Sequence, residues 1–220
     1  MKKQTTEIVI LLLVAVPFIA AAVVWQQMPA RMPIHFNING TPDKYGSKIV
    51  GLLLLPVMGT VAYAVLKFLP PFMTAAGQFN LLQKRLDVIR LALQGFLAAL
   101  YLVILLYTLN RQVDIVLFMV YAIALLLLVI GNNMNNIKPN YFMGIRTPWT
   151  MKDPEVWRKT HHFTARLWVA AAVIVMCVVP FLTQQLLMMV LPVYFTLLLI
   201  PPVLYSWRTS KKINPLKKAI

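Results

Sequence analysis

Acidic residues are scarce in this 220-residue chain, which has six Asp and Glu against 21 Lys and Arg. Charged residues make up only 12% of the sequence and hydrophobic residues make up 60%. A soluble domain of that composition could not cover its apolar residues with a polar surface, so a soluble globular protein is excluded. Because the excess apolar surface needs lipid, the composition predicts an integral membrane protein.

Cysteine is nearly absent as well. Cys177 is the one cysteine in the sequence, which excludes an intramolecular disulfide and a cysteine-rich metal site. The sequence also lacks a His-Glu-x-x-His motif and a recognisable pairing of a nucleophile with a base. We therefore expect no catalytic residues, no resident metal and no cofactor, and the chain is not expected to be an enzyme.

Ionisable residues are missing from the interior of the apolar runs. The acids all lie at the ends of runs or in loops: Glu7, Asp43, Asp87, Asp114, Asp153 and Glu155. Pumps and ion-coupled transporters usually carry such residues inside the membrane, where their burial serves ion or proton movement. Their absence disfavours a proton- or sodium-driven mechanism.

What the chain does contain is a series of apolar runs long enough to cross a bilayer, which takes about 20 residues per helix. We expect about six transmembrane helices, at Ile8–Trp25, Ile49–Leu69, Leu91–Leu109, Ile115–Ile130, Leu167–Leu182 and Leu186–Trp207. The expected fold class is an all-α integral membrane protein, with residues 1–220 forming a single membrane domain.

The basic residues predict the orientation of these helices. With the amino terminus in the cytoplasm, Arg31, Lys44, Lys48 and Arg111 lie outside and every other Lys and Arg lies inside. This distribution follows the positive-inside rule, and the opposite orientation would invert it. We therefore expect both termini in the cytoplasm, one large outer loop at residues 26–48, and large inner loops at 70–90 and 131–166.

The first inner loop has a helical pattern of its own. Apolar residues recur at spacings of three and four, opposite several charges: Phe79, Leu82, Leu86, Ile89 and Leu93. The pattern predicts that the third helix begins well before its apolar run. We expect this segment to lie against lipid headgroups, and binding of a partner is the alternative.

The outer loop contains turn-forming pairs that predict a compact segment, Asn39-Gly40 and Pro42-Asp43. His35 and Asp43 are expected to orient this loop by hydrogen bonds. As an alternative, the same two side chains could bind a metal ion across a dimer. An intramembrane hydrolase that uses this metal is then a further candidate function.

The second inner loop interleaves aromatic and basic residues, a mixture found at membrane interfaces and in protein contacts. Asp153-Pro154-Glu155 predicts the start of a helix, with an acid in its first turn. Single-stranded nucleic acids also bind to rings and cations, but a loop next to the membrane is not expected to contact nucleic acid directly.

Two segments resemble a known family of bacterial cytoplasmic-membrane proteins. They are PIHFNINGTPDKYGSK (Pro33–Lys48) and IKPNYFMGIRTPWT (Ile137–Thr150), the latter continuing through VWRKTH (Val156–His161). These segments are similar to proteins of the SdpI type, which are immunity proteins against a sporulation-delaying toxin. The resemblance implies a binding and signalling protein that meets a peptide toxin outside and holds a small DNA-binding autorepressor inside.

On this interpretation the outer loop would bind the toxin or another envelope signal through His35, Asn37, Gly40, Asp43 and Lys48. The inner docking surface would use Asn140, Tyr141, Arg146, Thr147, Trp149 and Trp157. A small peptide or lipid transporter or flippase, acting as a homodimer, is the alternative function.

Overall fold

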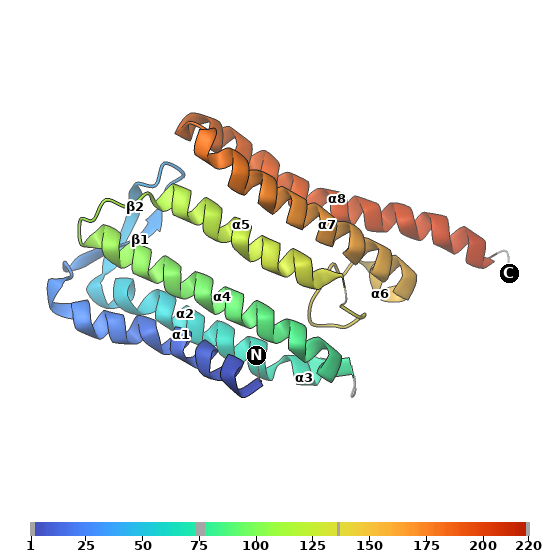
Figure 1. Ribbon diagram of the computed structural model, residues 1–220, viewed down its shortest axis with the longest axis horizontal. Coiled ribbons are helices and arrows are strands. Elements are labelled where there is room, and N and C mark those ends of the chain that lie inside the picture. The colour runs from blue at the N-terminus through green and yellow to red at the C-terminus, as the bar shows by residue number, and fades with distance from the viewer. Residues whose placement is uncertain (1–2, 74–77, 136, 219–220) are drawn as a thin grey trace. The chain divides into compact units, whose positions relative to one another are not determined.

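A computed structural model describes residues 3–73, 78–135 and 137–218 of the chain (Figure 1). Six of its helices are long and apolar enough to cross a membrane, which confirms the expected number of spans. They are α1 (Lys3–Val24), α2 (Lys48–Phe68), α4 (Gln78–Thr108), α5 (Ile115–Met134), α7 (Pro154–Val178) and α8 (Gln184–Lys218).

Shorter elements connect the long helices. The 3-10 helix η1 (Trp25–Gln27) follows α1 and leads into an antiparallel hairpin of β1 (Arg31–Phe36) and β2 (Pro42–Ser47). α3 (Pro70–Met73) precedes α4, α6 (Pro148–Lys152) precedes α7, and η2 (Val179–Phe181) follows it. The outer loop was expected to be compact because of its turn residues, and the structure adds that it contains two strands.

Several helices extend beyond their apolar runs, so the two segments expected to be large inner loops contain less irregular structure than expected. α4 begins at Gln78 and α7 begins at Pro154, within the segments assigned to the loops at 70–90 and 131–166. The predicted helix start is confirmed, because the Asp153 side chain accepts hydrogen bonds from the backbone N–H groups of Glu155 and Val156, at 2.8 and 3.3 Å. Side-chain capping therefore carries α7 three turns beyond the residues that hydropathy alone assigned to it.

The amphipathic segment at the start of α4 was expected to lie against lipid headgroups, and this expectation was wrong. Leu82 and Leu86 are buried in a core cluster with Met134, Ile137 and Trp157. The segment is part of the continuous helix α4, so its apolar face packs on protein.

The chain divides into two compact units, of which the first contains Met1–Phe68 and Asp87–Leu126. Its core cluster joins α1, the hairpin, α2 and α4 through Ala21, Met28, Met32, Leu52, Tyr101 and Leu105. Gln94, the most conspicuous polar residue within an apolar run, is 2% exposed and donates a hydrogen bond of 3.0 Å to the Gly59 carbonyl oxygen. This bond satisfies an amide that would otherwise be costly to bury.

The second unit contains Leu69–Leu86 and Leu127–Ile220. Within it α7 and α8 pack along each other (Figure 1). The Trp168 indole N–H donates to the carbonyl oxygen of Leu198 at 2.9 Å, and the Phe163 and Tyr205 rings stack with centroids 4.4 Å apart. Trp157 is 1% exposed and forms the centre of the cluster that anchors the loop between α5 and α6.

The orientation of the spans leads to a first prediction. Single cysteines replacing Asn39 and Asn135, in a Cys177→Ala background, should react from outside and from inside respectively with a membrane-impermeant maleimide. Both side chains are exposed, so access depends on the side of the membrane. Labelling of intact and of permeabilised cells measures this, and the reverse pattern would invert the assignment of both candidate sites below.

Candidate functional site

The hairpin residues singled out from the sequence give this segment its shape. The Asn37 side-chain oxygen accepts hydrogen bonds from the backbone N–H groups of Asn39 and Thr41, at 2.9 and 3.1 Å. Gly40 has a φ of +76°, and a Cβ there would lie 2.9 Å from Val116 Cγ2. Asn37 and Gly40 therefore fix the turn, as the turn-forming sequence predicted.

His35 and Asp43 pair across the hairpin, with 2.5 Å between His35 Nδ1 and Asp43 Oδ1. Both side chains were expected to orient this segment by hydrogen bonds, and the structure adds that they bond to each other. This hydrogen bond lowers the pKa of the Asp43 carboxyl below its ordinary value, so this exposed acid carries its negative charge throughout the neutral range. The Lys48 ammonium donates to the Trp25 carbonyl oxygen at 3.1 Å and thereby ties the start of α2, directly after the hairpin, to η1.

A pocket of about 430 Å³ lies beside the hairpin, and sequence reasoning missed it. Pro29, Arg31, Pro33, Tyr45, Tyr107, Thr108, Asn110 and Arg111 line it. Pro33 pairs with Tyr45 in the strand register, and Arg31 and Pro33 stand two apart, so these hairpin residues share one face. The strand alternation could have indicated this face, whereas the contribution from the end of α4 depends on tertiary structure.

The Ile137–Thr150 loop is folded around the side chain of Asn140. Its oxygen accepts from the backbone N–H groups of Phe142 and Met143, both at 2.8 Å. Its amide nitrogen donates to the carbonyl oxygens of Lys138 and Met143, at 2.9 and 3.2 Å. Asn140 is 6% exposed, so its contribution to any docking surface is to hold the loop in shape.

The buried side chains of Trp157 and His161 on α7 pack against the loop. Their rings stack with centroids 4.1 Å apart, and the Trp157 indole donates to the Ile137 carbonyl oxygen at 2.7 Å. The backbone N–H of Ile145 donates to His161 Nε2 at 3.0 Å, so Nδ1 carries the imidazole proton and donates to the Trp157 carbonyl oxygen at 2.8 Å. His161 is therefore a structural residue of the loop, a role that the sequence did not reveal.

The carboxyl-terminal part of the loop is fixed by a capping box and by α8. Thr147 caps α6, with reciprocal hydrogen bonds between Thr147 and Thr150. The Trp149 indole donates to Ser206 Oγ at 2.5 Å, which joins α6 to α8. Thr147 and Trp149 are thus partly occupied by contacts within the second unit.

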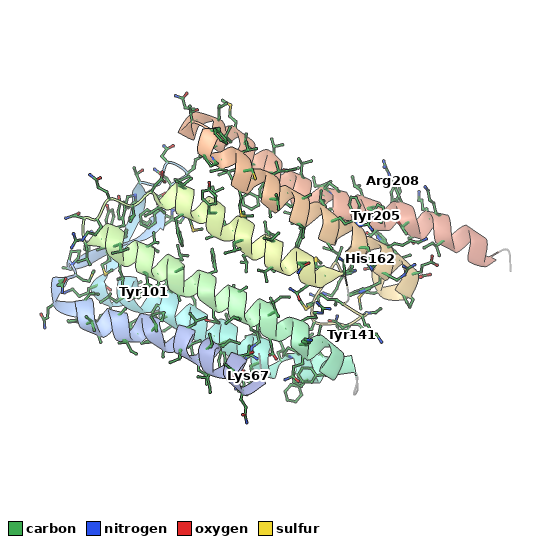
Figure 2. All side chains as sticks on the ribbon, viewed as in Figure 1. Lys67, Tyr101, Tyr141, His162, Tyr205 and Arg208 are labelled. Atoms are coloured by element: carbon green, nitrogen blue, oxygen red, sulfur yellow. The ribbon has the colours of Figure 1, made fainter. Side chains whose placement is uncertain are left out.

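Two of the predicted docking residues are exposed on the surface of the loop. Tyr141, which is labelled in Figure 2, is 68% exposed, and Arg146 is also exposed. The Arg146 guanidinium donates to the Tyr141 carbonyl oxygen, which holds the two residues together. Trp157, by contrast, is 1% exposed and could act on a partner only through the shape of the loop.

A charged cluster on α1, α2 and α4 was also missed. The Glu7 carboxylate accepts hydrogen bonds from Tyr63 Oη at 2.6 Å, Lys67 Nζ at 2.8 Å and Arg90 Nη2 at 3.0 Å. Arg90 Nη1 also donates to Asp87 Oδ1 at 3.0 Å. Periodicity could not reveal this cluster, because Glu7 and Arg90 are 83 residues apart in the sequence.

Metal-binding side chains do not gather in the described parts of the chain. Among residues 3–73, 78–135 and 137–218, no group of three or more His, Cys, Asp or Glu side chains is placed to hold a metal ion. His35 and Asp43 therefore have each other as partners, and no further ligand joins them there.

Comparison with known proteins covers both candidate sites. Residues 136–206 match the SdpI/YfhL protein family, and residues 12–60 match a domain of unknown function, DUF1648. The chain is similar to the immunity protein SdpI of Bacillus subtilis (strain 168), with 29% identity over 217 residues. That similarity covers 97% of this chain and 99% of the relative. No solved structure shows significant similarity to the chain. The chain is a multi-pass protein of the cell membrane, and it is similar to the SdpI/YfhL protein family in its carboxyl-terminal part and to the immunity protein SdpI along nearly its whole length.

Proposed function

We propose that this chain is a membrane immunity protein that binds a peptide toxin at its hairpin and couples to a cytoplasmic partner through the Ile137–Thr150 loop. The observation that carries the proposal is the similarity to an immunity protein over 97% of the chain, because it includes both the hairpin and the loop. The proposed activity is binding, and it needs no catalytic group.

The pocket beside the hairpin supports the binding of a peptide. Its volume of about 430 Å³ falls within the usual range of roughly 300–1,000 Å³ for ligand pockets. Arg31 and Arg111 supply guanidinium groups, and Tyr45 and Tyr107 supply rings with a hydroxyl. Such residues are enriched where proteins bind peptides, because they combine apolar contact area with hydrogen-bond donors. His35, Asn37, Gly40, Asp43 and Lys48 would contribute by fixing the hairpin that forms one wall.

The Ile137–Thr150 loop supports the docking of a soluble protein such as a small DNA-binding repressor. Tyr141 and Arg146 are exposed on a backbone that Asn140, Thr147 and His161 hold by hydrogen bonds. A loop that is already ordered loses less conformational entropy when a partner binds.

The hairpin half of the proposal is tested by survival. Expression of the chain in a Bacillus subtilis strain that lacks SdpI should restore growth in the presence of the sporulation-delaying toxin. Arg31→Gln combined with Arg111→Gln should abolish this protection, because both pocket cations are lost. Lys84→Gln with Lys152→Gln removes two exposed charges outside both the pocket and the Ile137–Thr150 loop and should leave protection intact.

Membrane levels of each variant are measured by immunoblotting, so that loss of protection is compared at equal expression. Protection that persists in the Arg31 and Arg111 double variant would contradict a role for the pocket. Absence of protection by the wild-type chain at normal membrane levels would contradict the immunity function toward this toxin.

A further inference from the structure

A second pocket, which the proposed function does not use, lies on α7 and α8 within the second unit. It has a volume of about 170 Å³ and is lined by Arg158, Lys159, His162, Phe163, Arg166 and Tyr205. Arg158, His162 and Arg166 follow one another at intervals of four residues, so they form one stripe along α7. Figure 2 labels His162 on α7 and Tyr205 on the neighbouring helix α8.

The two arginines of this pocket have no acidic partner among the described residues. Glu155 lies near enough to Arg158 to interact with its charge, but its ion pair is with Lys159, whose ammonium lies 2.9 Å from the Glu155 carboxylate. Arg158 and Arg166 are both exposed, and no ion pair involves either of them within residues 3–73, 78–135 and 137–218. The pocket therefore presents uncompensated positive charge to a ligand.

Two stacked aromatic rings, those of Phe163 and Tyr205, line the pocket beside its charged residues. The Phe163 and Tyr205 rings are nearly parallel, at an interplanar angle of 8°, and their stacking fixes the spacing of α7 and α8 at this level. Tyr205 is half-buried and brings its hydroxyl group to the lining. A ligand here would meet guanidinium donors on one helix and a tyrosine on the other.

The pocket lies at the end of an apolar run, where the headgroup layer of a membrane is expected. Arg166 directly precedes the apolar run that begins at Leu167, and the stripe from Arg158 to Arg166 spans about 12 Å at 1.5 Å per residue. On α8, Trp207 is 42% exposed, and the Lys211 ammonium lies 4.0 Å from its ring centroid. Tryptophan with lysine at the end of an apolar run is typical of the membrane interface.

We propose that this pocket binds the phosphate group of an anionic phospholipid. The guanidinium groups of Arg158 and Arg166 would donate hydrogen bonds to phosphate oxygens, a pairing that suits their planar fork of donors. At about 170 Å³ the pocket is smaller than those that enclose drug-sized ligands, but it lies at the end of an apolar run, where lipid phosphates are expected. The acyl chains would then run along the apolar surfaces that begin at Leu167.

Native mass spectrometry of the full chain in a neutral detergent tests this proposal with three probes: phosphatidylglycerol, phosphatidylcholine and inorganic phosphate. We expect phosphatidylglycerol to bind more tightly than phosphatidylcholine. Arg158→Gln combined with Arg166→Gln should weaken phosphatidylglycerol binding by about tenfold or more, because charge-assisted hydrogen bonds are lost. Arg158→Lys combined with Arg166→Lys keeps both positive charges but lacks the paired donors of guanidinium. Its affinity for phosphatidylglycerol should lie between that of the wild type and that of the Gln double variant.

The control is the double variant Lys138→Gln and Lys152→Gln, which removes two exposed charges of the same unit outside the pocket. It should bind phosphatidylglycerol as the wild type does. An equal loss in the control would overturn the proposal in favour of general charge attraction, and an unchanged affinity in the arginine double variant would overturn the site itself. Inorganic phosphate binding at the lipid's affinity would show a free phosphate site and would overturn the lipid as its source.

Discussion

Gly144→Ala is expected to lower the stability of the second unit by about 2 to 6 kcal/mol, combining backbone strain with overpacking. Gly144 has a φ of +121°, which residues with a Cβ rarely adopt. A Cβ would also contact His161 Nε2 and would lie 2.9 Å from Trp157 Cη2. Neither ring can move away easily, because each is 1% exposed and stacked on the other. A lower midpoint of thermal unfolding in mild detergent, with faster tryptic cleavage after Arg146, would show this effect.

Gly95→Ala is the matched control. A Cβ at Gly95 meets nothing within 4 Å, and the residue lies inside α4, where alanine favours the helix by up to about 1 kcal/mol. This variant should be as stable as the wild type or slightly more stable. An unchanged unfolding midpoint for Gly144→Ala would contradict the packing of the Ile137–Thr150 loop on Trp157 and His161.

The spans were predictable because hydropathy is a local property of the sequence. Each expected run lies within or largely overlaps one of the six candidate spans. The ends of the helices were less predictable, since polar side chains extend α4 and α7 beyond the apolar residues. The start of α7 is an instructive exception, because an Asp-Pro-Glu sequence signals an N-cap without any tertiary information.

The candidate sites were predictable only in part, for a related reason. The turn at Asn37 to Gly40 and the hydrogen bonding of His35 and Asp43 lie within one short segment; the sequence indicated the turn and that both side chains form hydrogen bonds, although not that they bond to each other. The role of His161 depends on a contact with Ile145, 16 residues away, and the pocket beside the hairpin needs Arg111, which follows α4. Trp157 was expected at a docking surface because tryptophan is common there, but aromatic density does not reveal which ring is buried.

The charged cluster around Glu7 gives the second large expected effect. Glu7→Gln should destabilise the first unit by about 2 to 4 kcal/mol, because it leaves a buried guanidinium with weaker pairing. The Arg90 side chain is 6% exposed, and Glu7 accepts from it at 3.0 Å while also accepting from Lys67 at 2.8 Å. The expected loss of stability is smaller than the largest losses known for broken buried ion pairs, because Asp87 still pairs with Arg90. The midpoint of thermal unfolding in mild detergent measures it.

Glu155→Gln makes the same chemical change in an exposed pair and serves as the control. The Glu155 and Lys159 side chains are 43% and 41% exposed, so their pairing is expected to contribute about 0 to 1 kcal/mol. In the Glu7→Gln background, Arg90→Gln should cost less than it does in the wild type, because the buried charge that lost its partner is then removed as well. Equal costs of Arg90→Gln in both backgrounds would show that Glu7 and Arg90 do not stabilise each other, and the cluster would then contribute through apolar packing of the two side chains.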